Sequence, residues 1–400
     1  MPLSTLEQRV ADEIASRSDD LLSDLKRHVA MPTGSGNLEA LEESRATFSD
    51  RMKALGANVS HIAGDPRPEW LGPSMDPIPP TAACARLVPG VPRVLVAGHL
   101  DTVHDPAGSF RELSIRPDGK TATGPGCVDM KGGLVIAAAA LEALEAVGAK
   151  ASWTFSLNSD EETGTYHSDR ALRDLASQHD VGLALEPALA GGELAVQRMG
   201  SGQFMLEVTG KSAHVGRAFA DGVSAVTALG HRLVALGELA EQGHIVNVGP
   251  LAGGTVVNAV PDSAKAWGNA RYPDAQAGDE LGAMIDALAT DGVGLPKVIV
   301  HRSFNRPAKP MTDGTERLAL AARAVAEDLG QSLPFAKTGG VCDGNNLQAA
   351  GLPTIDTLGV RGGGLHTPDE WIELASLVER CQLLAILIAR IADRGWPMAD

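Results

Sequence analysis

Residues 93–98, Arg-Val-Leu-Val-Ala-Gly, form a short apolar run that is rich in branched side chains and ends at a glycine. Such a run is typical of a strand that is buried on both faces of a sheet. Residues 152–158 alternate like a second strand, and residues 181–185 predict a third. Between the first two, the Ala- and Leu-rich stretch 131–147 predicts a helix that Gly148 ends. Strands that alternate with helices predict an α/β fold with a mostly parallel sheet between helices.

The middle of the chain has a different pattern. Its strand-like stretches alternate polar and apolar residues, as half-exposed strands do, and two helical stretches lie among them. These strands and helices are expected at residues 204–209, 222–240, 265–272, 278–289 and 297–303. The α/β pattern resumes at 313–330. We therefore predict a smaller α+β domain, with antiparallel strands in one layer and two helices in the other, inserted into the first domain.

The ends and connections complete the predicted organisation. Residues 5–30 predict helix and lack the basic and apolar stretches of a secretory signal. The proline-rich segment 64–92 is expected to be a surface excursion. Thr367-Pro-Asp-Glu370 has the signature of a capping box, which predicts a helix from there toward Arg394. No uncharged apolar run is long enough to predict a transmembrane helix.

Composition narrows the function classes. The chain has 400 residues, which suggests two domains, and a formal net charge of −16. A chain this acidic repels nucleic acid and anionic lipid, and therefore neither nucleic acid nor membrane is an expected partner. An anionic substrate would need a local cationic pocket. The four cysteines match no disulfide framework or CxxC zinc knuckle. Isolated thiols are typical of a reducing compartment, so we expect a cytoplasmic protein.

Two polar segments lie between the strand predicted at 93–98 and the helix predicted at 131–147. His99 and Asp101 share one face of an extended chain, so Asp101 is placed to hold the second nitrogen of a metal-bound His99. A lone His-x-Asp is more often a satisfied loop histidine. The glycine-rich loop 124–133 contains Asp129. A phosphate-binding loop is the alternative, but the sequence fits neither GxGxxG nor the P-loop, and Asp129 would repel phosphate. We therefore favour a metal role for Asp129.

Three further segments contain candidate ligands: two follow predicted strands, and one precedes the capping-box signature. Asp160-Glu161-Glu162 comes directly after the second strand, and three adjacent carboxylates are costly unless solvent or cations neutralise them. A solvated acidic turn is the alternative, but in open α/β sheets ligands bind at this edge. Adjacent residues point apart, so Glu161 and Glu162 can take different roles. Glu186 ends the third strand and His366 precedes the capping box. Two histidines and three carboxylates suit Zn²⁺, with Co²⁺ or Mn²⁺ as alternatives.

Seven short segments in order resemble the M20 metallopeptidases. They are GHLDT (98–102), GPGCVDMKGG (124–133), SDEETGT (159–165), LEP (185–187), GKSAHVG (210–216), NAVP (258–261) and LHTPDE (365–370). The resemblance is strongest to glutamate carboxypeptidases of the carboxypeptidase G type. It is weaker to acetylornithine deacetylase and succinyl-diaminopimelate desuccinylase. It implies a zinc-exopeptidase-like catalytic domain at 1–199 and 308–400, with an inserted lid and dimerisation domain at 200–307.

The resemblance also implies residue roles at the centre. Two Zn²⁺ ions per chain would share Asp129 as a bridging ligand. His99 and Glu186 would complete one site, and Glu162 and His366 the other. Glu161 would be the general base, and Asp101 would orient His99.

For the lid, the resemblance implies contacts with substrate and partner. His214 would reach into the active site of the partner in a homodimer; without the resemblance it is a surface-loop histidine. Asn258 and Arg271 would bind the substrate's carbonyl and carboxylate, and Arg306 would also bind substrate. The backbone of Gly339-Gly340 would contact the carboxylate. Glutamate-specific members tend to carry a basic residue between positions 186 and 200, where this chain has no lysine and only Arg198 as a candidate. A preference for glutamate therefore does not follow.

These features together predict a two-metal hydrolase that cleaves the amide bond of an N-acyl amino acid or small peptide with a free carboxylate. A dipeptidase or a biosynthetic deacylase of the same class is the main alternative. A metal-free relative retained as a binding protein is the non-enzyme alternative.

Overall fold

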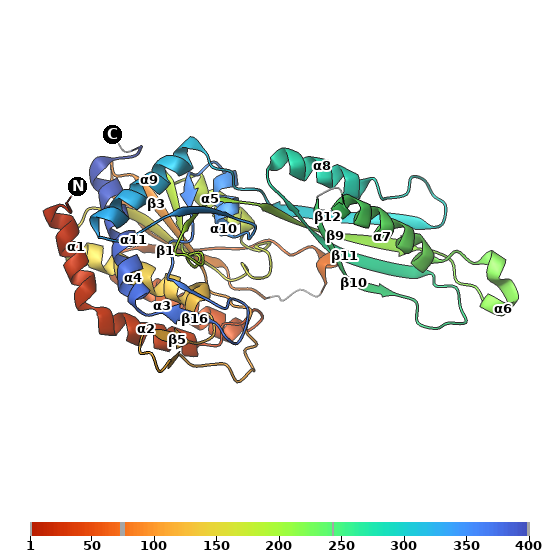
Figure 1. Cartoon of the computed structure of the whole chain (residues 1–400), viewed down its shortest axis with the longest axis horizontal. Helices are drawn as coiled ribbons and strands as arrows, with labels where there is room; N and C mark the ends of the chain where they lie inside the picture. The colour runs from red at the N-terminus through yellow and green to blue at the C-terminus, as the bar shows by residue number, and fades with distance from the viewer. Residues whose placement is uncertain (1, 73–76, 242–243, 398–400) are drawn as a thin grey trace.

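The computed structural model describes residues 2–72, 77–241 and 244–397. Figure 1 shows an elongated molecule with two parts: a broad part built on a six-stranded sheet and a narrow part built on a four-stranded sheet. Helices α1 (Thr5–Ser16) and α11 (Ala375–Arg394), the first and last helices of the described chain, lie on the broad part. The α/β class and the additional α+β part predicted from the sequence are confirmed.

The six-stranded sheet has the order β1-β2-β6-β3-β7-β14. At its centre, β3 (Arg93–His99) pairs in parallel with β6 (Ser152–Asn158) on one side and with β7 (Val181–Ala184) on the other. These are the three strands predicted from the apolar runs. Outside these three, β14 (Thr354–Ile355) pairs in parallel with β7, β2 (Thr81–Arg86) pairs antiparallel with β6, and β1 (Asn58–Ile62) pairs antiparallel with β2.

Helices cover both faces of this sheet. Because β3 is extended, Val94 and Val96 face one layer of helices while Leu95 and Ala97 face the other, and all four are buried. The first layer consists of α1 (Thr5–Ser16), α2 (Ser18–Ala30), α3 (Leu38–Ala54), α4 (Gly132–Ala146), α9 (Asp313–Asp328) and α11 (Ala375–Arg394). The second consists of α5 (Asp169–Ala176) and α10 (Asp343–Ala349).

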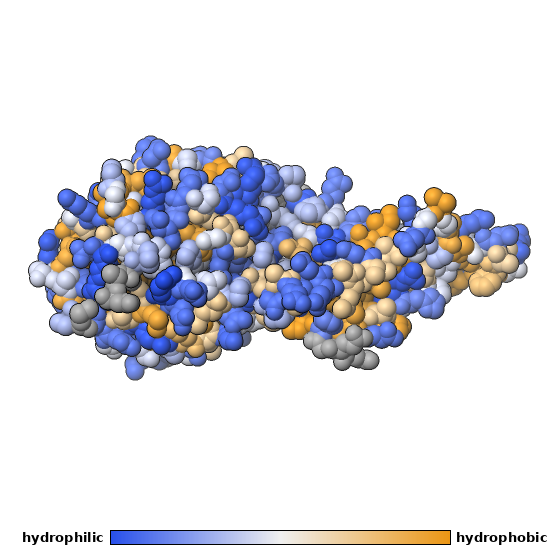
Figure 2. Space-filling model, turned by 90° about the horizontal axis from the view of Figure 1, so that it is seen from above, coloured by the Kyte–Doolittle hydropathy of each residue, from blue (hydrophilic) through white to orange (hydrophobic). Residues whose placement is uncertain are grey.

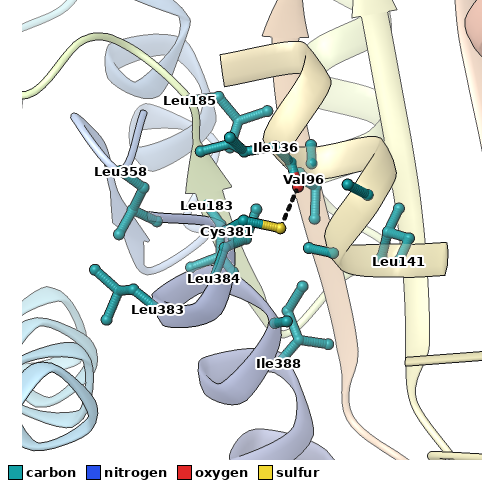
Figure 3. Close-up of a cluster of buried hydrophobic side chains, with 14 of the residues drawn as sticks. Val96, Ile136, Leu141, Leu183, Leu185, Leu358, Cys381, Leu383, Leu384 and Ile388 are labelled. Atoms are coloured by element: carbon teal, nitrogen blue, oxygen red, sulfur yellow. Dashed lines mark hydrogen bonds between the residues drawn. The ribbon is translucent and has the colours of Figure 1, made fainter. Parts of the chain in front are cut away.

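Figure 3 shows how α4 and α11 pack in the first layer. Cys381 of α11 lies among leucine and isoleucine side chains, and its thiol donates to the main-chain oxygen of Ile136 in α4 at 3.4 Å. Burial raises the pKa of the Cys381 thiol. All four cysteines are buried and unpaired, which confirms the prediction of isolated thiols.

The four-stranded sheet of the narrow part is antiparallel, with the order β10-β11-β9-β12. Its elements are β9 (Gly200–Thr209), α7 (Ala225–Glu241), β10 (Ile245–Gly253), β11 (Ser263–Tyr272), α8 (Ala275–Asp286) and β12 (Lys297–Arg306). Both helices pack on one face of the sheet around Phe204, Leu206 and Val208 of β9. The sequence pattern did not predict β10, whose residues are mostly exposed at the edge of the sheet.

Short elements complete the chain. They are η1 (Glu69–Leu71), β4 (Ser114–Ile115), β5 (Thr121–Thr123), η2 (Cys127–Lys131), β8 (Leu194–Arg198), α6 (Val215–Ala218), η3 (Phe219–Asp221), β13 (Phe335–Thr338), β15 (Gly362–Gly363) and β16 (Trp371–Glu373). Within the described ranges, no helix has both the length and the apolar character needed to cross a membrane.

The predicted helix start at residues 367–370 is wrong. Residues 371–373 form β16, which pairs with β5, and α11 begins only at Ala375. The Thr367 hydroxyl accepts a hydrogen bond from the main chain of Asp369, as in a turn. The Glu370 carboxylate bonds to a distant loop instead of capping a helix. The sequence signature failed because both of its side chains have other partners.

Candidate metal centre

The candidate ligands lie where three parallel strands end. His99 is the last residue of β3, while Glu162 lies shortly after β6 and Glu186 shortly after β7. These strands are neighbours and run in the same direction, so their carboxyl ends meet at one edge of the sheet. The fold therefore brings these three side chains together from segments far apart in the sequence.

Asp129 reaches the same edge from the glycine-rich loop before α4. Gly133 permits this approach, because a Cβ atom there would lie 2.5 Å from the main-chain oxygen of Leu185. Asp129 Oδ1 lies 3.4 Å from His99 Nε2, and its Oδ2 lies 3.5 Å from His366 Nε2. One carboxylate thus stands between two imidazoles.

Each imidazole also faces a second carboxylate. His99 Nε2 lies 3.8 Å from Glu186 Oε1, and His366 Nε2 lies 3.3 Å from Glu162 Oε2. The five side chains therefore form two sets of donors that share Asp129. His366 has a φ of +63°, a conformation that non-glycine residues rarely adopt and that clusters at functional sites.

The unpaired atoms of this cluster fit a bound cation. His99 Nε2 and Asp129 Oδ1 are buried and have no hydrogen-bond partner. Ligand atoms of His99, Asp129 and Glu162 all lie within 4.8 Å of one another. Burying such groups without a partner is costly, and a divalent metal would coordinate all of them. Imidazole nitrogen and carboxylate oxygen are ligands that zinc accepts.

The pKa values of the cluster also favour a bound cation. Burial raises the pKa of Glu162 to about 7 and raises that of Glu186 well above its ordinary value. Hydrogen bonding to Asp129 and Glu162 raises the pKa of His366 to about 10. Burial alone would raise the pKa of Asp129 too, but contacts with His366 and His99 hold it below its usual range. The raised pKa values of both glutamates show that burial disfavours their negative charge, which a bound cation would offset.

Asp101 contacts His99 differently from the prediction. His99 Nδ1 donates to the main-chain oxygen of Asp101 at 2.9 Å, whereas the nearest Asp101 carboxylate oxygen is 3.5 Å from that nitrogen. The carboxylate instead accepts hydrogen bonds from the main-chain N–H groups of Glu161 at 3.2 Å and Glu162 at 3.0 Å. Asp101 therefore orients His99 through its main chain and holds the Glu161-Glu162 turn through its side chain.

Arg306 lies against Glu161. Its Nη1 donates to Glu161 Oε1 at 2.5 Å, and its Nη2 donates to the Glu161 main-chain oxygen and to the Thr165 hydroxyl. The Arg306 side chain is almost fully buried. Its guanidinium is therefore engaged with the acidic turn, although the resemblance implies contact with substrate.

A cavity of about 510 Å³ opens beside the metal centre. Its lining includes the predicted residues Glu161, Glu162, Arg271, Arg306, Gly340 and His366. Arg271 Nε donates to Asn269 at 3.0 Å, and its Nη1 donates to the main-chain oxygen of Gly339 at 3.4 Å. Arg271 and the Gly339-Gly340 backbone therefore adjoin in one wall of the cavity.

His214 and Asn258 lie elsewhere. Both are exposed at the tip of the narrow part, where Val215 N–H donates to the main-chain oxygen of Asn258 at 3.1 Å. His214 precedes α6, which Figure 1 shows at the end of the molecule farthest from the broad part. The structure therefore brings these two residues together but not to the metal centre of their own chain.

Glu370 is a residue of this site that sequence reasoning missed. Its Oε1 accepts hydrogen bonds from the main-chain N–H groups of Val128 at 2.9 Å and Asp129 at 3.0 Å. Its Oε2 accepts from the Gly126 N–H at 2.8 Å and lies 2.5 Å from His104 Nε2. This fully buried carboxylate therefore holds the loop that carries Asp129. The only sequence signal was an acid shortly after His366, which we attributed to helix capping.

The chain is similar in sequence to known proteins. The sequence model of the family described as "Peptidase family M20/M25/M40" matches residues 95–390. Carboxypeptidase G2 of Pseudomonas sp. (strain RS-16) is 27% identical over 92% of this chain and 88% of its own. Succinyl-diaminopimelate desuccinylase 2 of Shewanella loihica is 28% identical over 86% of this chain and 94% of its own.

A solved structure shows the same fold. It is the YXEP protein of Bacillus subtilis, described as a dinuclear metal-binding peptidase from the M20 family. It superposes with a TM-score of 0.63 at 16% identity, over 95% of this chain and 99% of its own.

Proposed function

This chain belongs to peptidase family M20/M25/M40 and is a metal-dependent peptidase or amidohydrolase; we propose that it hydrolyses the amide bond of an N-acyl amino acid or small peptide with a free carboxylate. The observation that carries this proposal is the position of Asp129 between two imidazoles, each of which faces a further glutamate. Two members of this cluster, Glu162 and His366, line the cavity. Such a cluster suits metal-assisted hydrolysis.

We propose two zinc ions as the cofactor. His99 and Glu186 would hold one, His366 and Glu162 the other, and Asp129 would contact both. When bound, the two ions polarise the scissile carbonyl and lower the pKa of the attacking water. The buried, unpaired His99 Nε2 and Asp129 Oδ1 support this assignment.

Glu161 is the proposed general base. It adjoins the cluster and lines the cavity, but no ion pair links it to either histidine among the described residues. Its carboxylate accepts the proton of the attacking water and later donates it to the leaving amine. Arg306 and Asp101 hold the turn that carries it, so Glu161 enters the reaction already positioned.

Arg271 and the Gly339-Gly340 backbone are the proposed site for the substrate carboxylate. Arg271 forms no ion pair within the described parts of the chain and lines the cavity. A guanidinium and main-chain N–H groups together suit a carboxylate. This site supplies the local positive charge that an anionic substrate needs in a chain with net charge −16.

We further propose that the protein is a homodimer whose lids, residues 200–307, complete each other's active sites. Strand β10 is an exposed edge of its sheet, with Ile245 51% and Leu251 59% exposed, and such an edge is a template for pairing with a second copy. His214 and Asn258, at the lid tip, would then reach the metal centre of the partner. The four unpaired, buried thiols support a cytoplasmic location.

The first test is metal dependence. The purified protein is treated with a chelator, metal removal is verified by elemental analysis, and hydrolysis of N-acyl amino acids and dipeptides is measured. We expect no hydrolysis without metal and recovery with Zn²⁺ or Co²⁺. The preferred compounds separate a carboxypeptidase or aminoacylase from a dipeptidase or a biosynthetic deacylase. Full activity of verified metal-free protein would contradict the proposal.

A further inference from the structure

The proline-rich segment does more than run over the surface. We call residues 63–72 the strap. Its first half is fixed to the chain that follows the acidic turn: the Asp65 N–H donates to the main-chain oxygen of His167 at 3.0 Å, and Asp65 forms an ion pair with Arg170 at 3.0 Å. Gly64 packs so closely on the His167 ring that a Cβ atom would lie 2.3 Å from it.

The second half of the strap is fixed to the lid. Trp267 of β11 donates its indole N–H to the main-chain oxygen of Trp70 at 2.8 Å. The Trp70 ring stacks on His301 of β12, with centroids 6.1 Å apart. Figure 1 shows η1, which contains Trp70, beside the start of the lid sheet. The strap therefore bridges the two parts of the molecule on the side of the metal centre.

Between these anchors, Arg67 enters the active-site cavity. It lines the same 510 Å³ space as Glu161, Glu162 and His366. Its Nε is buried without a hydrogen-bond partner, and its Nη2 donates a long hydrogen bond of 3.4 Å to the main-chain oxygen of Leu71. Among the residues that the structure describes, no carboxylate forms an ion pair with it.

Among the described residues, two guanidinium groups in the cavity lining, those of Arg67 and Arg271, therefore have no acidic partner. Arg306, the third arginine in its lining, is paired with Glu161. Arg271 belongs to the lid strand β11, whereas Arg67 belongs to the strap. The two guanidinium groups therefore line the cavity from different segments of the chain. A partly buried guanidinium without a counter-ion is costly in a protein, and a bidentate carboxylate is the partner that fits it.

We propose that Arg67 forms a second anion subsite, which takes a second carboxylate of the substrate. The inference rests on the proposed function, in which Arg271 takes the first carboxylate. The preferred substrate is then a dianion: either a dicarboxylic amino acid with a neutral acyl group, or a monocarboxylic amino acid with a dicarboxylic acyl group. In both cases the strap supplies charge selectivity.

The test compares matched substrates that differ only in the second charge. One pair is N-acetylglutamate and N-acetylglutamine; the other is N-succinylalanine and its succinamoyl amide. In at least one pair we expect kcat/KM of the metal-loaded wild type to be about tenfold or more higher for the dianion, as a charge-assisted pair implies. Arg67→Gln should bring that ratio close to one, and Arg67→Lys should retain part of it.

Arg9→Gln is the matched control, because it removes the same charge from α1, which contributes no residue to the cavity lining, and should leave the ratio unchanged. The substrate pair whose kcat/KM ratio falls in Arg67→Gln shows which side of the amide carries the second carboxylate. A dianion preference that survives Arg67→Gln, or its absence in both pairs, would overturn the subsite.

Binding supplies a readout that does not need turnover. Titration calorimetry of the four compounds with metal-loaded Glu161→Gln, with and without Arg67→Gln, should show the same loss of dianion preference. If the metal-loaded wild type hydrolyses neither these compounds nor the dipeptides of the first test, the proposed function is wrong, while the binding ratio still decides whether Arg67 selects a dianion.

Discussion

Glu161 and Glu162 are neighbours in the chain, but their carboxylates meet different partners. Glu161 accepts from Arg306, and Glu162 lies 3.3 Å from His366. Adjacent side chains point apart, and here the main-chain N–H of each residue is bonded to a separate oxygen of Asp101. One fixed turn thus presents one carboxylate to the proposed metal and the other to the cavity.

The separation of roles predicts opposite results for two conservative substitutions. Glu161→Gln should lower kcat by about a hundredfold or more, the usual contribution of a general base, while two metal ions per chain are retained. Glu162→Gln should lower the metal content. Steady-state kinetics of both variants gives kcat, and elemental analysis gives the number of metal ions per chain. If Glu161→Gln lost metal and Glu162→Gln kept it, the two assignments would have to be exchanged.

Protonation of the cluster predicts how pH affects metal binding. Burial raises the pKa of Glu162 from 4.5 to about 7, and contacts with Asp129 and Glu162 raise that of His366 from 6.5 to about 10. Groups with raised pKa values stabilise the metal-free fold at low pH, and this contribution is lost as pH rises through those values. Metal binding needs the deprotonated forms and so strengthens over the same range.

The increase in Tm on adding Zn²⁺ should therefore grow between about pH 5.5 and pH 8. Calorimetric Tm values with and without Zn²⁺ in the same non-chelating buffers measure this difference, and effects of pH on the rest of the protein cancel. An increase that shrinks as pH rises would argue against Glu162 and His366 as ligands.

At the scale of elements, the loop that carries Asp129 depends on a segment that is distant in the sequence. Glu370 accepts three main-chain hydrogen bonds from this loop, from Gly126, Val128 and Asp129, and contacts His104. A carboxylate suits this place because all four of its partners can donate hydrogen bonds. Glu370 therefore acts on the metal centre through the loop, as a positioning residue.

Glu370→Gln should weaken metal binding, because its amide NH₂ group would face main-chain donors. We expect the dissociation constant for Zn²⁺, measured by competition with a chelating dye, to rise by about tenfold or more, as for other residues behind metal ligands. Glu373→Gln is the control, since Glu373 is also near β16 but pairs with Arg361. Equal affinities of Glu370→Gln and the wild type would remove this role.

At the scale of the whole molecule, the elongated shape separates residues that one reaction would need together. The metal centre lies on the broad part, and His214 lies at the far tip of the narrow part (Figure 1). Figure 2 shows apolar side chains exposed along this narrow part. Pairing of two copies would cover such surface and carry each tip to the other chain.

Complementation tests this shared site. His214→Ala and Glu161→Gln homodimers should each be nearly inactive. When subunits exchange, one of the two sites in every heterodimer has both residues intact, so activity should return toward half of the wild-type value. Mass spectrometry of differently tagged chains verifies the exchange. If exchange is verified and activity stays absent, His214 does not act on the partner's site.

The local pattern of the sequence was sufficient for the main elements. Apolar runs and alternation predicted β3, β6 and β7, because a strand buried on two faces has to be apolar along its length. Residue chemistry at the strand ends predicted His99, Glu162 and Glu186 as candidate ligands, because parallel strands bring their carboxyl ends to one edge. Asp129 and His366 were predicted from a glycine-rich loop and from the segment before the capping-box signature. Each of these signals spans only a few residues, so it can be read without knowledge of the remaining chain.

Only the tertiary structure decided the partners of the isolated charged groups. Glu370 bonds to a loop more than 240 positions earlier in the chain, Arg306 pairs with Glu161 from 145 positions away, and Arg67 enters the cavity because the strap is anchored at both ends. The edge strand β10 also escaped the sequence pattern, since its exposed side chains lack the apolar periodicity of a packed face. The physical reason is common to all four: a charged or exposed side chain carries no periodic signal, so its partner depends on which distant segments pack beside it.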